Sequence, residues 1–330
     1  MATATSAKRS GPIAGPGGAE FPVRARPNWG RWAVGALALA LAGWLVESVL
    51  LNENIHWDRV RHYLFAPTIL DGVWVTVWIS IAATALGLTL GVVLAVMKLS
   101  KNPVLQWLST VYIWFFRGTP ALVQLIFWYN LAFLFPYLTL RVPFTQIGMR
   151  WDTNQVMSGF TAALLGLGLN LAAYFAETVR AGIQAVDRGQ TEAALAGGMT
   201  SLQAMRIVVL PQALRIIIPP TGNEFISMLK TTSLIVVVAG NDLMTNASQI
   251  YKQNNLIIEL LIVASLWYML LTAVATVLQA RLERRFGVDA VRLVRGPGAV
   301  RTLLDRLGGK NPGASAAPAA ASTMAIEEKA

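Results

Sequence analysis

Two side chains of opposite charge lie within an apolar stretch of this 330-residue chain. Glu224 and Lys230 belong to the segment PPTGNEFISMLKTTSL at 219–234. A charge inside a bilayer is costly, so an intramembrane carboxylate or ammonium group faces protein or water. A zwitterion could therefore pass here, with Glu224 facing its ammonium group and Lys230 facing its carboxylate. The candidate substrate path consists of Asn223, Glu224, Ser227, Lys230, Thr231 and Ser233.

The same segment also has a purely structural interpretation. Glu224 and Lys230 could pair to brace a helix, or could extend toward a membrane interface. Pro219 and Pro220 favour the path, because they remove backbone donors and free carbonyl groups. A membrane segment tolerates this only where its backbone is buried or lines a cavity. Both interpretations stay open on the sequence alone.

The sequence contains no recognisable catalytic or metal-binding pattern. Its two histidines, His56 and His62, lie in one stretch of mixed charge, and it has no cysteine. It lacks the HExxH metal-binding pattern and the G-x-x-x-x-G-K-[S/T] loop that binds nucleotide phosphates. We therefore expect no enzymatic activity, no resident metal or cofactor, and no nucleotide hydrolysis by this chain itself.

Long uncharged runs must position the candidate residues, and these runs define the fold class. The chain is 55% hydrophobic and only 13% charged. Since about 20 apolar residues cross the hydrocarbon core, we predict an all-α integral membrane protein with six transmembrane helices. The predicted spans are 31–51, 72–97, 119–137, 159–183, 215–243 and 256–280. Between them we expect a short outer amphipathic helix within 52–72, an interfacial helix at 104–116, and outer loops at 138–158 and 240–255.

The placement of basic residues predicts how the chain is oriented. The net charge is +10, and arginines and lysines gather before the first span and after the last. Positive residues favour the cytoplasmic side of a membrane, so both termini are expected there and no nucleic-acid partner is expected. The chain then divides into a disordered tail (1–28), an anchor span with an outer amphipathic segment (29–67), a main membrane domain (68–285) and a second disordered tail (286–330).

Two short polar groups lie where helices are expected to end. The run RGTP at 117–120 should break the chain, with Arg117 at the C-terminal end of a helix, where a cation is favoured. Glu177 and Arg180 lie one helical turn apart near the inner end of the fourth span, where they can pair. The candidates for structural or gating roles are Arg117, Gly118, Thr119, Pro120, Glu177 and Arg180.

A further passage, QTEAALAGGMTSLQAMRIVVLPQAL at 190–214, carries a specific spacing. It resembles the EAA loop of ABC importer permeases, here 188–211, in the residues Glu192, Ala193, Ala194, Gly198, Leu210 and Pro211. Other segments narrow the resemblance to the polar amino acid uptake permeases, the histidine, glutamine, arginine and glutamate group. These segments are DG (71–72), FFRGTPALVQLIF (115–127), NLAAYFAETVRAGIQAVDRGQTEAALAGGM (170–199), LPQALR (210–215) and the 219–234 segment.

The resemblance covers about 68–285 and implies a five-span importer core, with the first span as an extra N-terminal anchor helix. It implies a permease subunit in the bacterial plasma (inner) membrane that imports a polar L-amino acid from an external binding protein. A second permease subunit, identical or paralogous, and two ATPase subunits that bind the ATP would complete the complex. The six EAA-loop residues named above would couple the permease to the ATPases.

The residue types in the EAA loop suit such a contact. We expect a short helix over 188–205 that begins at a cap formed by Gln190 or Thr191. Its alanines would make it slim enough to enter a groove on a partner. Gly198 permits a sharp turn, and Pro211 is expected to end the segment and redirect the chain.

An alternative function and a substrate preference follow from the 219–234 segment. Broken helices with charges near the membrane midplane also suit a secondary transporter or a channel for a small zwitterion, not coupled to ATP. That alternative leaves the EAA loop unexplained. Thr231 stands where family members often have aspartate or asparagine, which favours a neutral or acidic amino acid over arginine or lysine.

Overall fold

The computed structural model describes residues 29–141 and 148–285. The chain divides into two compact units, with the boundary after Trp57. In the first unit, α1 (Trp29–Leu50) forms the predicted anchor helix, and its apolar side chains are exposed. The predicted tails at 1–28 and 286–330 lie outside the described residues.

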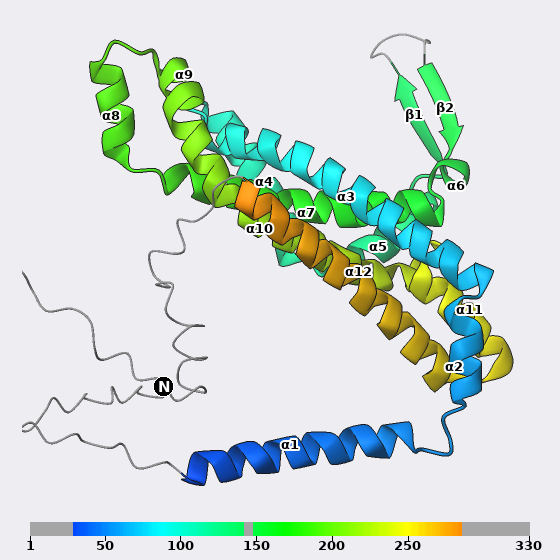
Figure 1. Ribbon diagram of the computed structural model, residues 1–330. Helices are drawn as coiled ribbons and strands as arrows, with labels where there is room; N and C mark the ends of the chain where they lie inside the picture. Colours follow the sequence, from blue (N-terminus) through cyan, green and yellow to red (C-terminus); the bar gives the residue numbers. More distant parts are fainter. Residues whose placement is uncertain (1–28, 142–147, 286–330) are drawn as a thin grey trace, which may run out of the picture. The chain divides into compact units, whose positions relative to one another are not determined.

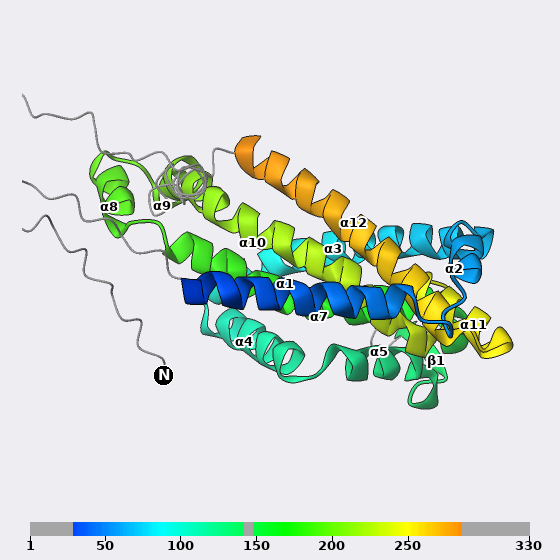
Figure 2. The same cartoon turned by 60° about the horizontal axis from the view of Figure 1, so that its bottom comes forward.

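The described part of the second unit is helical apart from one hairpin of two strands (Figure 1). Its helices are α2 (Trp57–Leu64), α3 (Pro67–Leu99), α4 (Pro103–Gly118), α5 (Ala121–Tyr129), α6 (Thr153–Val156), α7 (Gly159–Gln184), α8 (Arg188–Ala196), α9 (Ser201–Gln203), α10 (Leu210–Thr231), α11 (Leu243–Asn254) and α12 (Ile257–Arg285). Shorter helical turns are η1 (Leu131–Phe133), the π-helical η2 (Ala204–Val209) and η3 (Thr232–Val238). The helices α8 and α9 lie at one end of the bundle, the α8 end, and α2, α11 and the hairpin lie at the other, the hairpin end (Figures 1 and 2).

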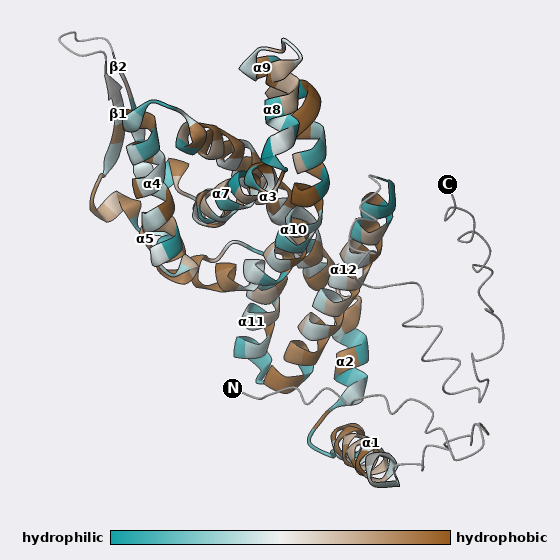
Figure 3. Ribbon diagram, turned by 90° about the vertical axis from the view of Figure 1, so that its left-hand side faces the viewer, coloured by the Kyte–Doolittle hydropathy of each residue, from teal (hydrophilic) through white to brown (hydrophobic). Residues whose placement is uncertain are grey.

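The prediction of an α-helical membrane protein with several spans is confirmed. Among the described residues, five helical stretches are long and apolar enough to cross a membrane, including α1 and one continuous run over Ser201–Val238. The pair α4 and α5 also passes this test jointly, so the number reaches six if the pair counts as one span. Figure 3 shows apolar residues along α3, α7, α10 and α12.

The centre of the second unit is the contact between α3 and α7. Glycines on α3 let the two helices approach closely, as small residues do in membrane helix pairs. A methyl group at Gly87 would lie 2.8 Å from a side-chain carbon of Leu171, and one at Gly91 would lie 2.9 Å from the ring of Phe175. These glycines therefore set the spacing of the helix pair that holds the rest of the bundle.

The third span, predicted over 119–137, does not form one continuous helix. The helix α5 has nine residues, which rise only about 13.5 Å against a hydrocarbon core of about 30 Å. It is bent by 100° from α4. The cause is Pro120, which has no amide hydrogen to donate and precedes α5 in an extended conformation. The predicted interfacial helix at 104–116 is α4 itself.

Two segments predicted as loops contain regular secondary structure. The segment 138–158 contains an antiparallel hairpin of β1 (Tyr137–Arg141) and β2 (Gly148–Asp152), followed by α6. The segment 240–255 contains α11, which packs against α3 and α12 and buries several polar side chains. Asp242 begins α11 by accepting hydrogen bonds from the amide groups of Met244 and Thr245. Burial raises the pKa of the Asp242 carboxyl, and these donors oppose that rise.

Candidate functional site

The EAA loop lies at the α8 end and begins with a well-capped helix. Asp187, directly before α8, accepts a hydrogen bond from the amide of Gly189 at 2.7 Å. The predicted cap at Gln190 or Thr191 is therefore wrong, because the stronger acceptor lies earlier in the chain. Glu192 and Ala193 are exposed, whereas Ala194 is buried. The loop thus presents a carboxylate and small side chains to its surroundings.

Gly198 ends this helix in a conformation that suits glycine. Its φ is +85°, and the space around it is open. The next helix, α9, begins after Thr200. The hydroxyl of Thr200 accepts a hydrogen bond from the amide of Gln203, and the side chain of Gln203 accepts one from the amide of Thr200. The predicted single helix over 188–205 is therefore broken, and Gly198 is the turn that the sequence suggested.

The sequence predicted that Pro211 ends the segment, and this prediction is wrong. The chain is helical through α9, η2 and α10, and Pro211 lies in the first turn of α10. Inside this run Pro211 removes one backbone hydrogen bond, and the missing donor falls where η2 passes into α10. The preceding turn is π-helical, with the amide of Leu210 donating to the carbonyl of Met205. The helical run thus continues through the proline.

The candidate substrate path occupies α10 and its junction with η3. Asn223, Ser227 and Lys230 are exposed and recur at helical spacing on one face. Glu224 is half-buried beside that face. Thr231 and Ser233 donate to backbone carbonyls of the same helix, at 2.9 Å and 2.8 Å.

The interpretation of Glu224 and Lys230 as a bracing pair finds no support in the geometry. The two residues are six positions apart, which is about 9 Å along a helix axis and on different sides of it. The structure shows no ion pair between them, although both are among the described residues. Lys230 is therefore an exposed cation on a membrane-spanning helix, and its charge must be compensated outside α10.

Gln279 on α12 touches this face and was missed from the sequence. Its side-chain amide donates to the carbonyl of Pro219 at 3.2 Å, to Asn223 at 3.2 Å and to Glu283 at 2.8 Å. It fits because Gly222 has no side chain, and a methyl group there would lie 2.6 Å from Gln279. The carbonyls that Pro219 and Pro220 leave without a helical donor are those four residues earlier, at Arg215 and Ile216, so the bond from Gln279 to Pro219 is an additional contact between α12 and α10. A lone glutamine in an apolar run gives no sign of its partner.

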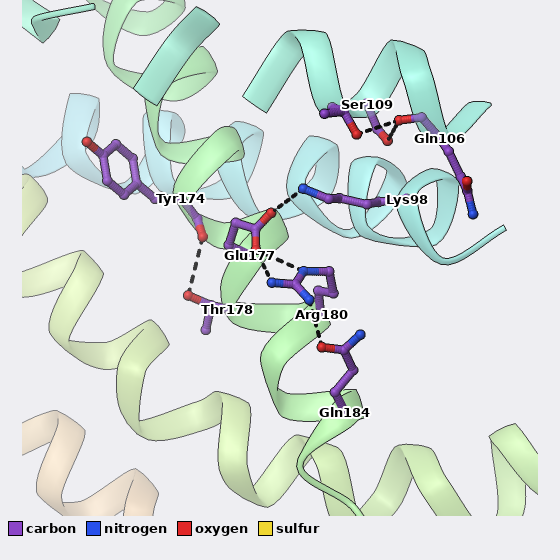
Figure 4. Close-up of polar contacts among 9 residues, drawn as sticks. Lys98, Gln106, Ser109, Tyr174, Glu177, Thr178, Arg180 and Gln184 are labelled. Carbon is purple, nitrogen blue, oxygen red and sulfur yellow. Dashed lines mark hydrogen bonds and ion pairs between the residues drawn. The ribbon is translucent and has the colours of Figure 1, made fainter. Parts of the chain in front are cut away.

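The predicted pair of Glu177 and Arg180 is present and forms part of a larger network near the α8 end (Figure 4). Arg180 donates twice to one carboxylate oxygen of Glu177, at 2.6 Å and 2.8 Å. Lys98 on α3 donates to the other oxygen at 2.6 Å. Arg180 also donates to Gln184 at 2.7 Å. Lys98 was not predicted, because it is distant in sequence and ends a different span.

The RGTP run forms the joint between α4 and α5. Gly118 ends α4, Thr119 follows in an extended conformation, and the Arg117 guanidinium lies over the ring of Tyr174 at 5.2 Å. The buried side chain of Gln124 closes the joint by donating to the Thr119 hydroxyl at 2.7 Å and to the carbonyl of Phe116 at 3.0 Å.

The joint is also tied to α7. Asn170 donates to the same Phe116 carbonyl at 3.0 Å and contacts Gln124 at 3.4 Å. The EAA loop, the α10 face and this joint are separate features along the bundle, and the structure does not bring them into one pocket.

Comparison with protein families gives one matching family model, described as the binding-protein-dependent transport system inner membrane component, over residues 87–288. Several curated proteins are similar. The arginine transport system permease protein ArgU of Corynebacterium glutamicum is 44% identical over 275 residues, covering 82% of this chain and 85% of that protein. The probable glutamine ABC transporter permease GlnM of Bacillus subtilis is 35% identical, covering 72% and 100%. The glutamate/aspartate import permease GltK of Escherichia coli is 34% identical, covering 66% and 93%.

Solved structures agree with the sequence comparisons. A crystal structure of an amino acid ABC transporter with histidines is 36% identical, with a TM-score of 0.58, covering 67% of this chain and 95% of that one. The methionine ABC transporter MetNI in an inward-facing conformation is 19% identical, with a TM-score of 0.53, and shows a shared fold.

Proposed function

Because this chain belongs to the family of binding-protein-dependent transport system inner membrane components, we propose that its α10 face passes a polar amino acid across the membrane under the control of the EAA loop. The chain is a multi-pass permease subunit of an amino acid ABC importer, and not an enzyme. The hydrolysis of ATP takes place on a separate ATPase subunit of the transporter.

The observation that carries the coupling proposal is the exposed, capped helix α8. It presents Glu192 and Ala193 at one end of the bundle, and Gly198 turns the chain back into the helical run that bears the α10 face. A short helix with small side chains fits a groove on another protein. We assign Glu192, Ala193 and Gly198 to the ATPase contact, the buried Ala194 to the packing that supports it, and Leu210 and Pro211 to the connection with α10.

The charges at the α8 end support an orientation of the chain in the membrane. Lys98 ends α3 there, and the last turn of α12 carries Arg284 and Arg285. Positive residues favour the cytoplasmic side. We therefore assign the α8 end and both termini to the cytoplasm, and the hairpin end to the outer surface, where a substrate-binding protein would deliver the amino acid.

The exposed cation on α10 supports a second permease subunit. Lys230 with Asn223 and Ser227 forms a polar face that lipid would not accommodate. A second copy of this chain or a paralogue would cover the face and enclose a water-filled path. Glu224 would then attract the ammonium group of the amino acid and Lys230 its carboxylate group, at different heights along the path.

Purification from the native membrane with a tag on this chain tests the assignment against an ion-driven transporter. An ABC permease is expected to bring a P-loop ATPase with it, and uptake in proteoliposomes is expected to require ATP. Uptake that follows an ion gradient, with no ATPase in the complex, would support the alternative of a secondary transporter or channel.

The side chain at position 231 is expected to influence substrate choice. Thr231→Asp places a carboxylate near Glu224 and Lys230, which should shift preference toward arginine, by several-fold relative to glutamine and glutamate. Competition among these three amino acids in proteoliposomes measures the shift, with Thr232→Val, a buried neighbour, as the control. Unchanged competition in Thr231→Asp would show that the binding protein alone selects the substrate. The relatives are named for different amino acids, arginine among them, so all three must be compared.

A further inference from the structure

The hairpin of β1 and β2 has one apolar and one polar face. Its register pairs Leu138 with Trp151 and Thr139 with Arg150. Paired residues in an antiparallel hairpin lie on the same face, and successive residues alternate between faces. Leu138, Met149 and Trp151 therefore share one face. Tyr137, Thr139, Arg150 and Asp152 share the other.

A contact within the hairpin confirms this division. The guanidinium of Arg150 lies over the ring of Tyr137, 3.5 Å from its centre. This cation–π contact holds the cation on the polar face. The apolar face has no comparable cover, since Met149 is 62% exposed and Trp151 is 41% exposed. An apolar face of this kind on a two-stranded hairpin is not stable in water by itself.

The position of the hairpin indicates what covers that face. Its strands follow η1, where α5 has ended, and precede α7, the long span that begins at Gly159. The base of the hairpin thus lies beside the start of α7. It is fixed there by the amide of Thr153, which donates to the carbonyl of Pro136 at 3.1 Å.

The hairpin projects from the bundle next to an exposed apolar segment. It leaves the bundle beyond α6 at an oblique angle to α3 in Figure 1, and Figure 3 shows it from the side, above α4. The segment just before it exposes Phe133 at 86%, Leu134 at 62% and Phe135 at 56%. Aromatic side chains gather at the boundary between lipid and water.

We propose that the β1–β2 hairpin lies on the surface of the bilayer, with Leu138, Met149 and Trp151 inserted between the lipid headgroups. Arg150 on the opposite face lies within reach of lipid phosphate groups and water. This is the β-strand counterpart of an amphipathic helix that lies in the plane of a membrane interface. The hairpin would brace the bent pair of α4 and α5 against the lipid at the end where α5 stops.

The absence of cysteine from the natural chain makes a direct test practicable. Met149→Cys places a fluorescent label on the apolar face of the full-length protein in lipid nanodiscs, and Thr139→Cys places the same label on the polar face as a matched control. We expect lipids that carry a nitroxide near the headgroup to quench the Met149→Cys label several-fold more than the Thr139→Cys label. Iodide in the water phase should give the reverse order.

Three outcomes would overturn the proposal. Equal quenching of both labels by iodide would show that the hairpin stands in water. Protection of the Met149→Cys label from both quenchers would show that protein covers the apolar face. Protection that arises only when a purified substrate-binding protein is added would make the hairpin a docking surface for that protein. Trp151→Cys lies on the same face and must follow Met149→Cys, and no reading depends on transport activity.

Discussion

Replacement of Gly198 by arginine is expected to abolish ATP-driven uptake while the protein still inserts into the membrane. Gly198 has a φ of +85°, a backbone conformation that costs most L-residues about 1–2 kcal/mol. The space around it is open within this chain, so the added side chain would meet no atom of the permease, and at the proposed coupling contact it would meet the ATPase. Uptake into proteoliposomes that contain the reconstituted complex measures the loss, which we expect to exceed tenfold.

A matched variant separates the turn from the contact. Asparagine adopts the left-handed conformation more readily than other residues with side chains, so Gly198→Asn should retain most of the uptake. ATP-dependent uptake at the normal rate by a stably inserted Gly198→Arg protein would falsify the assignment of this loop to coupling.

Replacement of Glu177 by leucine is expected to lower the free energy of unfolding more than the other substitutions proposed for this protein. Glu177 receives Lys98 on one oxygen and Arg180 on the other, and its side chain is only 18% exposed. Its removal leaves two cations facing each other without a counter-charge. Breaking a buried pair costs about 3–5 kcal/mol. Lys98 and Arg180 keep 25% and 31% of their surface, so we expect a loss on the order of 2–3 kcal/mol.

Thermal unfolding in detergent measures this loss, and two further variants locate its cause. Thr178→Val changes the neighbouring residue, whose hydroxyl makes only a local bond to Tyr174 at 3.3 Å, and should have little effect. The double variant Glu177→Leu with Lys98→Leu removes one of the stranded cations and should recover part of the stability. A double variant as unstable as the single one would mean that charge is not the cause.

The long spans could be predicted from the sequence because the signal is local. A run without charge identifies α3, α7 and α12, and the basic flanks belong to the same stretches of chain. The Glu177–Arg180 pair was predictable for the same reason, since its members are one helical turn apart. The turn at Gly198 was predictable because only one residue type takes that conformation readily.

The errors arose where distant parts of the chain decide the structure. The polar composition of 240–255 suggests a loop, yet α11 forms there because α3 accepts it. A methyl group at Gly72 would lie 2.8 Å from the Leu243 backbone, and Thr76 accepts a hydrogen bond from the Leu243 amide at 3.0 Å. Lys98 and Gln279 were missed likewise, because their partners lie 79 and 60 residues away.

The helical run over Ser201–Val238 connects the end of the EAA loop to the α10 face without a loop between them. Thr200 at the start of this run and Lys230 near its far end are about 45 Å apart along its axis at 1.5 Å per residue. Successive residues of a helix are rotated by about 100° about its axis. A rotation of this helical run about its axis by that angle would therefore point Glu224 in the direction in which Asn223 points. A rotation of the helical run that starts at the EAA loop would thus change which side chains the α10 face presents, without a shift of the helix along the membrane normal.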